Sequence, residues 1–398
     1  MKRYTEYKDS GVQWLGVIPS HWEIRRTKYI WKETDRRSEF GSEQLLSVSQ
    51  YDGVREAQSE SRSESLKGYK IVKQENLVIN IMLAWLGGLG VSKHEGIVSP
   101  AYCVYKLLDA QNPYFLHYLY RTPLYLAEFA RHSTGIVPSR WRMYTDDFGE
   151  VLTILPPIEE QNRMVEYLDA ATSKIDEAIA QQQKMIDLLN ERKQIIINNV
   201  VTKGLNPNVK MKSSGVDWIG EIPEGWETLP MKYCMKIKNG MDYKHIETEA
   251  GIPVIGSGGQ FAYASDYLYD GEVVFFGRKG TIDKPLYFKG KFWAVDTMFY
   301  AIPQNNIIGK YLYYQGMTIP FKYYSTSTAL PSMTQTDLGN NPICLPSLVE
   351  QNIIVKHLDI EIGKLDKAIE ASNNQISLLQ ERKQIIINDV VTGKVKVI

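Results

Sequence analysis

The chain has 398 residues, of which 43% are hydrophobic and 23% charged, the values of an ordinary soluble globular protein. Its 46 Lys and Arg residues balance 46 Asp and Glu residues, so it lacks the basic excess that a free-standing DNA-binding protein usually carries. The sequence contains no apolar run of the ~18–20 residues that a membrane span needs, and its first residues do not resemble a secretory signal. We therefore expect no membrane association and a cytoplasmic location.

Two blocks of the sequence occur twice. Residues 10–23, SGVQWLGVIPSHWE, return at 214–227 as SGVDWIGEIPEGWE, 204 positions later. The second block has an offset of 190: residues 191–198 and 381–388 both read ERKQIIIN, and LPPIEEQN at 155–162 returns as LPSLVEQN at 345–352. The chain is therefore a tandem duplication of one plan, in which a short block, a long divergent region and a helical block follow one another. Because 204 − 190 = 14, the first divergent region is 14 residues longer than the second.

The divergent regions are predicted to be globular domains that mix strands and helices. In the second region, short β-like runs are separated by glycine turns, and they lie at 273–276, 286–288, 292–295 and 298–302. Helices are predicted at 113–131 in the first region and at 310–315 in the second. Together with the short blocks, these regions give one predicted domain at 1–154 and another at 207–344.

One loop of the second region has the composition of a nucleic-acid contact. Arg278, Lys279 and Thr281 lie in a glycine-framed turn, and Lys284 follows it. Glycine permits close backbone approach, while Arg and Lys can hold phosphate or read guanine. The later segment 325–335 is rich in hydroxyl groups and includes Ser332 and Thr334, which suit hydrogen bonds to base edges or to the DNA backbone.

The first region offers weaker candidates. Arg140 and Arg142 flank Trp141 in a segment that could reach phosphate while the indole packs, and Lys93 and His94 lie in a second loop. The alternative for each of these loops is a solvated turn without a ligand.

Each helical block predicts one long helix, within 155–206 and within 345–398. Ser347 and Glu350 fit a capping box, and Gly204 and Gly393 suit helix C-termini. Apolar residues alternate in steps of three and four over about four heptads, which is typical of a coiled coil. At about 45 residues, each helix would measure roughly 65–70 Å. The predicted seam contains Leu168, Ile175, Ile179, Ile186 and Leu189 in the first helix and Leu358, Leu365, Ile369, Ile376 and Leu379 in the second.

Each predicted helix has the other as its natural partner. Pairing within the chain would give two antiparallel helices with an internal pseudo-two-fold symmetry. Gln182 and Ser372 occupy the same seam position in the two copies, where a polar residue can fix the register. The alternative is a coiled coil that joins two copies of the chain. The fold class expected overall is α+β, with two mixed globular domains separated by the two long helices.

Motifs of catalysis are missing from the sequence. It has no phosphate-binding loop of the G-x-x-x-x-G-K-[ST] type, and Asn112-Pro113-Tyr114-Phe115 departs from the Asn-Pro-Pro-aromatic motif of amino-methyltransferases at its third residue. Cys103, Cys234 and Cys344 are isolated, and no group of Cys and His has metal-ligand spacing. We therefore expect no catalytic residue, no metal and no cofactor in this chain.

The repeated motifs resemble those of specificity subunits of type I restriction–modification systems. The likeness rests on the Ser-Gly-Val-x-Trp-[Leu/Ile]-Gly-x-Ile-Pro-x-x-Trp-Glu block, on Leu-Pro-x-x-x-Glu-Gln-Asn, and on the long helices ending in Glu-Arg-Lys-Gln, and it covers nearly the whole chain. The resemblance implies two target-recognition domains, each reading one half of a split, asymmetric site on double-stranded DNA. It also implies that the helices set the spacing between the half-sites.

The same resemblance implies the partners. Two modification subunits would dock on the helices, and motor-nuclease restriction subunits would complete the complex. S-adenosylmethionine, ATP and Mg²⁺ would then belong to the partner subunits. Two hypotheses from other classes stay open: a coiled-coil adaptor whose domains bind protein, and a self-sufficient methyltransferase, against which the missing cofactor loop speaks.

Overall fold

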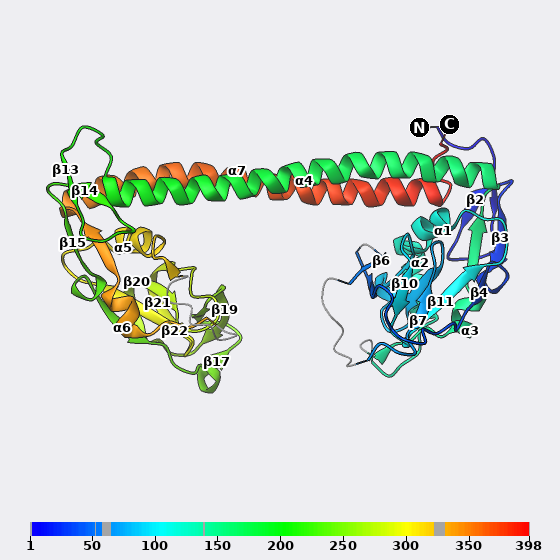
Figure 1. Ribbon diagram of the computed structural model, residues 1–398, viewed down its shortest axis with the longest axis horizontal. Helices are drawn as coiled ribbons and strands as arrows, with labels where there is room; N and C mark the ends of the chain where they lie inside the picture. The colour runs from blue at the N-terminus through cyan, green and yellow to red at the C-terminus, as the bar shows by residue number, and fades with distance from the viewer. Residues whose placement is uncertain (1, 52, 58–64, 138–139, 322–330, 398) are drawn as a thin grey trace. The chain divides into compact units, whose positions relative to one another are not determined.

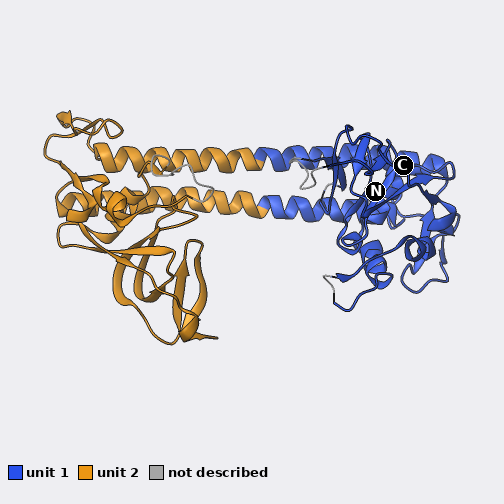
Figure 2. Ribbon diagram, turned by 60° about the horizontal axis from the view of Figure 1, so that its bottom comes forward, with its two compact units in different colours: residues 1–181, 375–398 blue, residues 182–374 orange. Residues whose placement is uncertain are grey.

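A computed structural model describes residues 2–51, 53–57, 65–137, 140–321 and 331–397 (Figure 1). The chain forms two compact units (Figure 2): unit 1 contains residues 1–181 and 375–398, and unit 2 contains residues 182–374. Each unit holds one mixed α/β domain and a part of each long helix, as the predicted fold class requires. The compact units divide both helices, so the four-part division expected from the sequence stays a prediction.

The two repeated blocks of each copy meet in a small sheet. In unit 1, β3 (Glu23–Arg26) pairs antiparallel with β12 (Leu152–Leu155). In unit 2, β15 (Glu227–Pro230) pairs with β23 (Pro342–Leu345) in the same way. We call this two-stranded sheet, together with the start of the helix that follows it, the frame. The frame explains why both ends of each copy are repeated, since they bracket the divergent region and pair with each other.

Short hairpins precede the frames. In unit 1, β1 (Tyr7–Asp9) pairs with β2 (Val17–Pro19). In unit 2, β13 (Met211–Ser213) pairs with β14 (Glu221–Pro223).

Within its described residues, the divergent region of unit 1 contains three small sheets and three short α-helices. A four-stranded sheet has the order β4-β11-β8-β9, and two-stranded sheets join β5 to β6 and β7 to β10. The predicted helix at 113–131 is two helices, because Thr122 caps a new helix that begins at Pro123. The strands are β4 (Trp31–Glu33), β5 (Leu46–Ser49), β6 (Gly53–Glu56), β7 (Lys70–Val72), β8 (Leu77–Asn80), β9 (Leu89–Val91), β10 (Gly96–Val98) and β11 (Tyr102–Leu107), and the helices are α1 (Pro113–Tyr120), α2 (Pro123–Arg131) and α3 (Thr145–Glu150).

The divergent region of unit 2 is built on one seven-stranded sheet with the order β16-β22-β20-β21-β18-β19-β17. The predicted strands are present, but the runs at 286–288 and 292–295 form a single strand, β21, which passes through Gly290. The strands are β16 (Met235–Asn239), β17 (Glu247–Thr248), β18 (Ile252–Gly256), β19 (Gly259–Ala264), β20 (Tyr269–Gly277), β21 (Leu286–Ala294) and β22 (Met298–Pro303), and the helices are α5 (Gly309–Gly316) and α6 (Gln335–Asn340).

Two long helices follow the frames: α4 spans Ile158–Lys203 and α7 spans Leu348–Val391. The predicted seam positions are buried or half-buried along both helices, whereas their neighbours are mostly exposed. The pairing is antiparallel. In unit 1, Lys383 Nζ of α7 lies 2.7 Å from Asp176 Oδ1 of α4, and in unit 2 the equivalent Lys193 Nζ lies 2.7 Å from Asp366 Oδ1. Pairing within the chain, predicted from the matched seams, is confirmed.

The helix ends follow the sequence signals with one exception. Ser347 caps α7, and its Oγ accepts a hydrogen bond from Glu350 N at 3.3 Å. The predicted return bond from the Glu350 side chain is wrong, because Glu350 Oε2 instead accepts from Trp226 Nε1 at 3.0 Å. Gly204 and Gly393 follow the two helices with φ of 73° and 75°, a conformation that favours glycine.

The Glu-Gln-Asn motif joins each frame to its divergent region. Gln161 is fully buried; its Nε2 donates to Pro156 O at 2.8 Å, and its Oε1 accepts from Asn112 N at 2.9 Å. Gln351 repeats this pattern, donating to Pro346 O at 3.0 Å and accepting from Ile308 N at 2.9 Å. In both copies one amide therefore holds the loop before α1 or α5 against the start of a long helix.

Candidate nucleic-acid interface

The two candidate segments of unit 2 lie together. Gly280 N donates to Pro331 O at 2.9 Å, Met333 N donates to Arg278 O at 3.0 Å, and Lys279 forms an isolated β-bridge with Ser332. We call residues 277–284 and 331–334 the unit 2 junction. Residues 325–330 of the hydroxyl-rich segment lie outside the described residues.

The turn at the unit 2 junction depends on glycine. A Cβ atom at Gly277 would lie 2.1 Å from Thr281 O, and Gly280 has a φ of 80°. The backbone can therefore close tightly beneath the side chains of the turn.

Three cations of the unit 2 junction face solvent. Arg278, Lys279 and Lys284 are exposed, and none of them forms an ion pair within the described part of the chain. The Arg278 guanidinium lies 6.0 Å from the centre of the Phe299 ring, which leaves its donors available to a ligand. Thr281 is exposed beside them, and Ser332 is half-buried. Thr334 has a structural task as well, since its Oγ1 caps α6 by accepting from Asp337 N at 3.1 Å.

The candidates of unit 1 occupy an equivalent junction. Met143, which corresponds to Met333, donates from its N to Ile81 O at 3.0 Å, in the loop that follows β8. The segment before Met143 is held by a bridge in which Thr134 N donates to Arg142 O at 3.0 Å and Arg142 N donates back at 2.9 Å. We call residues 81–88, 134–137 and 140–142 the unit 1 junction; Ser139 lies outside the described residues, as does residue 138.

The unit 1 junction has a different chemistry from that of unit 2. Trp141 packs edge-on against Trp85, with ring centres 5.3 Å apart. Arg140 is exposed, and Arg142 is half-buried and donates from Nη1 to Arg140 O at 2.9 Å. The loop beside them exposes three apolar side chains, Met82, Leu83 and Leu86. This loop was not predicted from the sequence, although its Met-Leu-Ala-Trp-Leu run directly after a strand could have indicated it.

Lys93 and His94 lie elsewhere in unit 1. Lys93 Nζ is 5.5 Å from the centre of the Tyr114 ring, and His94 Nδ1 is 3.8 Å from Glu56 Oε1. Ser92 N donates to Asn76 O at 2.8 Å, which ties this loop to the turn at 73–76. The structure therefore brings the remaining candidates together in two equivalent junctions and leaves Lys93 and His94 apart. DNA contact by each of these residues stays a prediction.

The side chains that could support thiol or metal chemistry are the cysteines, histidines and acids. The three cysteines are free, and burial raises the pKa of Cys234 to about 11 and that of Cys344 to about 12, which keeps both thiols protonated. The described residues contain no group of three or more His, Cys, Asp and Glu that could hold a metal ion. Among them there is also no helix long and apolar enough to cross a membrane.

Comparisons with known proteins show what this chain is similar to. The family model for the type I restriction modification DNA specificity domain matches residues 223–379. The chain is 27% identical over 288 residues to the type I restriction enzyme MjaVIII specificity subunit of Methanocaldococcus jannaschii, a match covering 63% of each chain. It is 27% identical over 435 residues to the putative type I restriction enzyme MjaX specificity subunit of the same organism, covering 96% of each. The match to the MjaVIII subunit thus spans less than two thirds of that relative.

A solved structure supports the same fold. A chain from a type I restriction–modification system, studied for complex assembly and conformational transition, superposes with a TM-score of 0.69 at 16% identity, over 95% of this chain and 99% of that one. This likeness concerns the fold. The matched domain and the two relatives make the chain similar to type I restriction–modification specificity subunits over most of its length.

Proposed function

We propose that this chain is the DNA-recognition subunit of a type I restriction–modification complex, and that each unit reads one half of a bipartite, asymmetric site. One observation carries the proposal. The same frame occurs in both units and positions an equivalent junction, yet the two junctions present different side chains. Unit 2 presents Arg278, Lys279 and Ser332, whereas unit 1 presents Arg140, Arg142 and the Trp85–Trp141 pair. Two unlike readers on one repeated frame suit two unlike half-sites.

The half-site assignment can be tested with variants of one junction at a time. Arg278→Gln should relax the sequence preference in one half-site only, and Arg140→Gln should do so in the other half-site. The readout is selection of bound duplexes from a random library by the chain assembled with its modification subunit. Changes in both halves from a single variant would contradict the assignment. Selection of no sequence by the wild-type assembly would favour an adaptor that binds protein.

Lys279 serves as a second test of the unit 2 junction. If its ammonium group holds a phosphate, Lys279→Ala should weaken binding about equally on all sequences and lower the salt dependence of log K by about 1. Unchanged affinity would remove Lys279 from the interface.

The long helices are proposed to set the spacing between half-sites. Inserting four residues near Gln182, with four more near Ser372 to keep the seams matched, lengthens the pair by about 6 Å. Since each base pair rises about 3.4 Å, the preferred spacer should grow by about two base pairs. An unaltered spacer in the selected sequences would refute this role.

The helices are also proposed to dock two modification subunits, with restriction subunits completing the complex. Apolar residues outside the seam support this proposal. In unit 2, Leu188 and Ile195 of α4 are 51% and 52% exposed, and in unit 1 the equivalent Leu378 and Ile385 of α7 are 66% and 51% exposed. Because this pair recurs at equivalent positions in the two units, each unit would bind one subunit.

Native mass spectrometry can count the docked subunits. Leu188→Glu with Ile195→Glu should leave one modification subunit on the chain, and adding Leu378→Glu with Ile385→Glu should leave none. The exposed Gln183→Glu is the matched control, and it should retain both subunits. Full stoichiometry in the fourfold variant would exclude these surfaces.

Catalysis is proposed to belong to the partner subunits, which would bind S-adenosylmethionine, ATP and Mg²⁺. Equilibrium dialysis of the isolated chain should therefore detect no binding of S-adenosylmethionine. Binding with a stoichiometry near one would revive the methyltransferase hypothesis.

A further inference from the structure

The charged residues of β4 and of the extended segment that follows it in unit 1 lie on two different sides of the chain. Side chains alternate along an extended segment, so Lys32, Thr34 and Arg36 lie on one side. The acids Glu33 and Asp35 lie on the other side with Arg37.

The acids have cationic partners on their own side of the segment. Lys70 Nζ lies 3.3 Å from Glu33 Oε1 and 3.6 Å from Asp35 Oδ1, and Arg37 Nη2 lies 2.9 Å from Asp35 Oδ1. Hydrogen bonding to Arg37 also lowers the pKa of Asp35, which keeps this carboxylate ionised. The side that carries Arg36 therefore receives no compensating acid from this segment.

Two lysines on that side face each other. Lys106 of β11 is the direct antiparallel partner of Lys32 in β4, and both residues are exposed. Like charges placed directly opposite in a sheet destabilise it. Neither lysine forms an ion pair within the described residues. An external anion would remove this repulsion.

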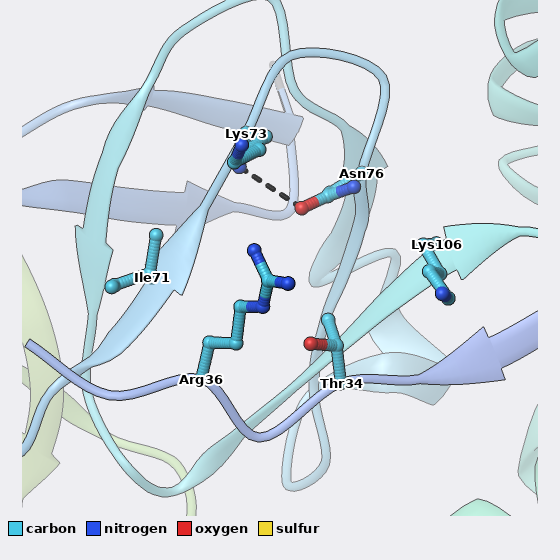
Figure 3. A pocket seen from close by; sticks show the side chains of 6 residues that line it. All are labelled: Thr34, Arg36, Ile71, Lys73, Asn76 and Lys106. Atoms are coloured by element: carbon cyan, nitrogen blue, oxygen red, sulfur yellow. Dashed lines mark hydrogen bonds between the residues drawn. The ribbon is translucent and has the colours of Figure 1, made fainter.

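Lys106 also lines a surface cavity of about 160 Å³ (Figure 3). Three of its six lining residues are cations, and none is an acid. Asn76 Oδ1 accepts from Lys73 N at 2.9 Å, which leaves the Asn76 amide NH₂ as a donor. In the close view, the Arg36 side chain extends toward the turn that carries Lys73 and Asn76. The lining residues are Thr34, Arg36, Ile71, Lys73, Asn76 and Lys106.

The backbone around the cavity is held by hydrogen bonds from three directions. Thr34 N donates to Val104 O, and Ile71 N donates to Arg36 O, both at 2.8 Å. Ser92 N donates to the carbonyl of Asn76 at 2.8 Å. The backbone that carries the donors is therefore held in place before a ligand arrives, which reduces the ordering cost of binding.

We propose that this cavity, the phosphate cradle, holds a phosphodiester group of the DNA backbone beside the half-site that unit 1 reads. The inference rests on the proposed function and adds a contact that the sequence motifs do not indicate. Three cations with a hydroxyl and an amide donor match the chemistry of a phosphate group. The cradle has no aromatic side chain on which a base could stack. A backbone contact of this kind fixes the position of DNA and carries no sequence information itself.

The test uses the full chain assembled with its modification subunit, and labelled duplexes with either the selected motif or a scrambled one. Because the cradle holds one phosphate, combining Arg36→Gln, Lys73→Gln and Lys106→Gln should lower the salt slope of log K by about 0.9, and each single variant should lower it by less. The triple variant should bind both duplexes about fivefold more weakly near 0.15 M salt, and the selected motif should not change. Arg3→Gln is the matched control, because Arg3 is an exposed cation of unit 1 outside the cradle. Thermal melts establish that the variants remain folded.

Four results would overturn the proposal. An unchanged slope in a folded triple variant, with normal binding by the wild type, removes the cradle and leaves the proposed function intact. A loss restricted to the selected duplex identifies base readout rather than a phosphate contact. If calorimetry with inorganic phosphate shows binding that the triple variant abolishes while its DNA affinity is unchanged, the cradle serves a free anion. Absence of DNA binding by the wild-type assembly would overturn the cradle and the proposed function together.

Discussion

The two units share the same frame, but the hydrogen bonds of its buried tryptophan differ between them. Trp22 in unit 1 and Trp226 in unit 2 are equivalent and almost fully buried. Trp226 Nε1 donates to Glu350 at 3.0 Å, whereas Trp22 Nε1 has no hydrogen-bond partner within the described part of the chain. In unit 1 the equivalent carboxylate, Glu160, already accepts from the hydroxyl of Tyr4.

The cause of this difference lies in two nearby residues. His21 Nε2 lies 2.8 Å from Glu160 Oε2, and its place in unit 2 is taken by Gly225. Tyr4 has a polar counterpart, Asn208, at the same offset of 204. Burial and the bond to Glu160 raise the pKa of Tyr4, so its hydroxyl remains the donor. A repeated motif can therefore keep its backbone role while its side-chain partners are exchanged.

The largest effect is expected when the pH is lowered. This change should reduce the stability of unit 1 because of His117. Burial, with Arg121 and Lys93 nearby, lowers the pKa of His117 to about 3, and its Nδ1 accepts from Val91 N at 3.1 Å. Below the ordinary value of about 6.5, the unfolded chain binds a proton that the folded unit does not. Stability is therefore complete above a pH of about 6.5 and falls toward a pH of about 3, by on the order of 1 kcal/mol per pH unit.

Thermal melts between about pH 7 and pH 4 can isolate this effect. His117→Gln, whose side-chain carbonyl can accept from Val91 N, should flatten the pH dependence. His357→Gln in unit 2 is the control and should leave the dependence of the wild type. Equal slopes in all three proteins would exclude His117 as the source.

Replacing the equivalent tryptophans by phenylalanine tests the difference in hydrogen-bond partners between the two units. Both Trp22→Phe and Trp226→Phe lose ring volume in a packed core. Trp226→Phe also removes a hydrogen bond and leaves Glu350 without that partner, so it should cost about 1–2 kcal/mol more in the free energy of unfolding. Equal losses in denaturant titrations would mean that the Trp226–Glu350 bond contributes nothing.

Replacing the glycine that follows each long helix should destabilise the two units to different extents, because the atoms around the two glycines differ. Replacing either by alanine places a side chain at positive φ, which costs about 1 kcal/mol. At Gly393 a Cβ atom would also lie 2.6 Å from Pro19 Cδ, whereas at Gly204 the nearest atom, Trp226 Cζ2, is 3.2 Å away. Gly393→Ala should therefore lower the melting temperature more than Gly204→Ala, and the reverse order would contradict this difference in packing.

The smallest effect is expected at the ion pairs between the long helices. Lys193–Asp366 and Lys383–Asp176 have the same separation, and their aspartates are equally exposed at 54%. Lys193→Ala and Lys383→Ala should each cost about 0.2–1 kcal/mol, and the cost should shrink in high salt. Double-mutant cycles with the aspartates measure the coupling. A clear inequality between the two pairs would show that the repeats differ at these positions as well.

The sequence was sufficient wherever the signal is local or repeated. The heptad pattern predicted both long helices and their pairing, since the seam residues match across the offset of 190. It could not predict that Glu350 bonds to Trp226, because that choice depends on the residues at two positions far from Glu350 in the sequence, which are Asn208 and Gly225 in unit 2 and Tyr4 and His21 in unit 1. The two runs within β21 were separated in the prediction because Gly290 resembles a turn, whereas the neighbouring strands of the sheet carry the chain straight through it.

The candidate site was predicted only in part for a similar reason. Glycines and paired cations made residues 278–281 conspicuous in the sequence, but their contact with 331–333 arises from tertiary pairing. The phosphate cradle draws residues from three separate segments and has no motif. Only the alternation of Lys32, Glu33, Thr34, Asp35 and Arg36 along one extended segment could have drawn attention to it.

The most direct test of the central claim is the methylome of a host that expresses this chain together with the modification subunit of its complex. The account predicts one methylated motif with two unlike halves and a fixed spacer, present only when the chain is present. Arg278→Gln should change one half of that motif and leave the other intact. A motif without a spacer, or one that persists in the absence of the chain, would contradict the account.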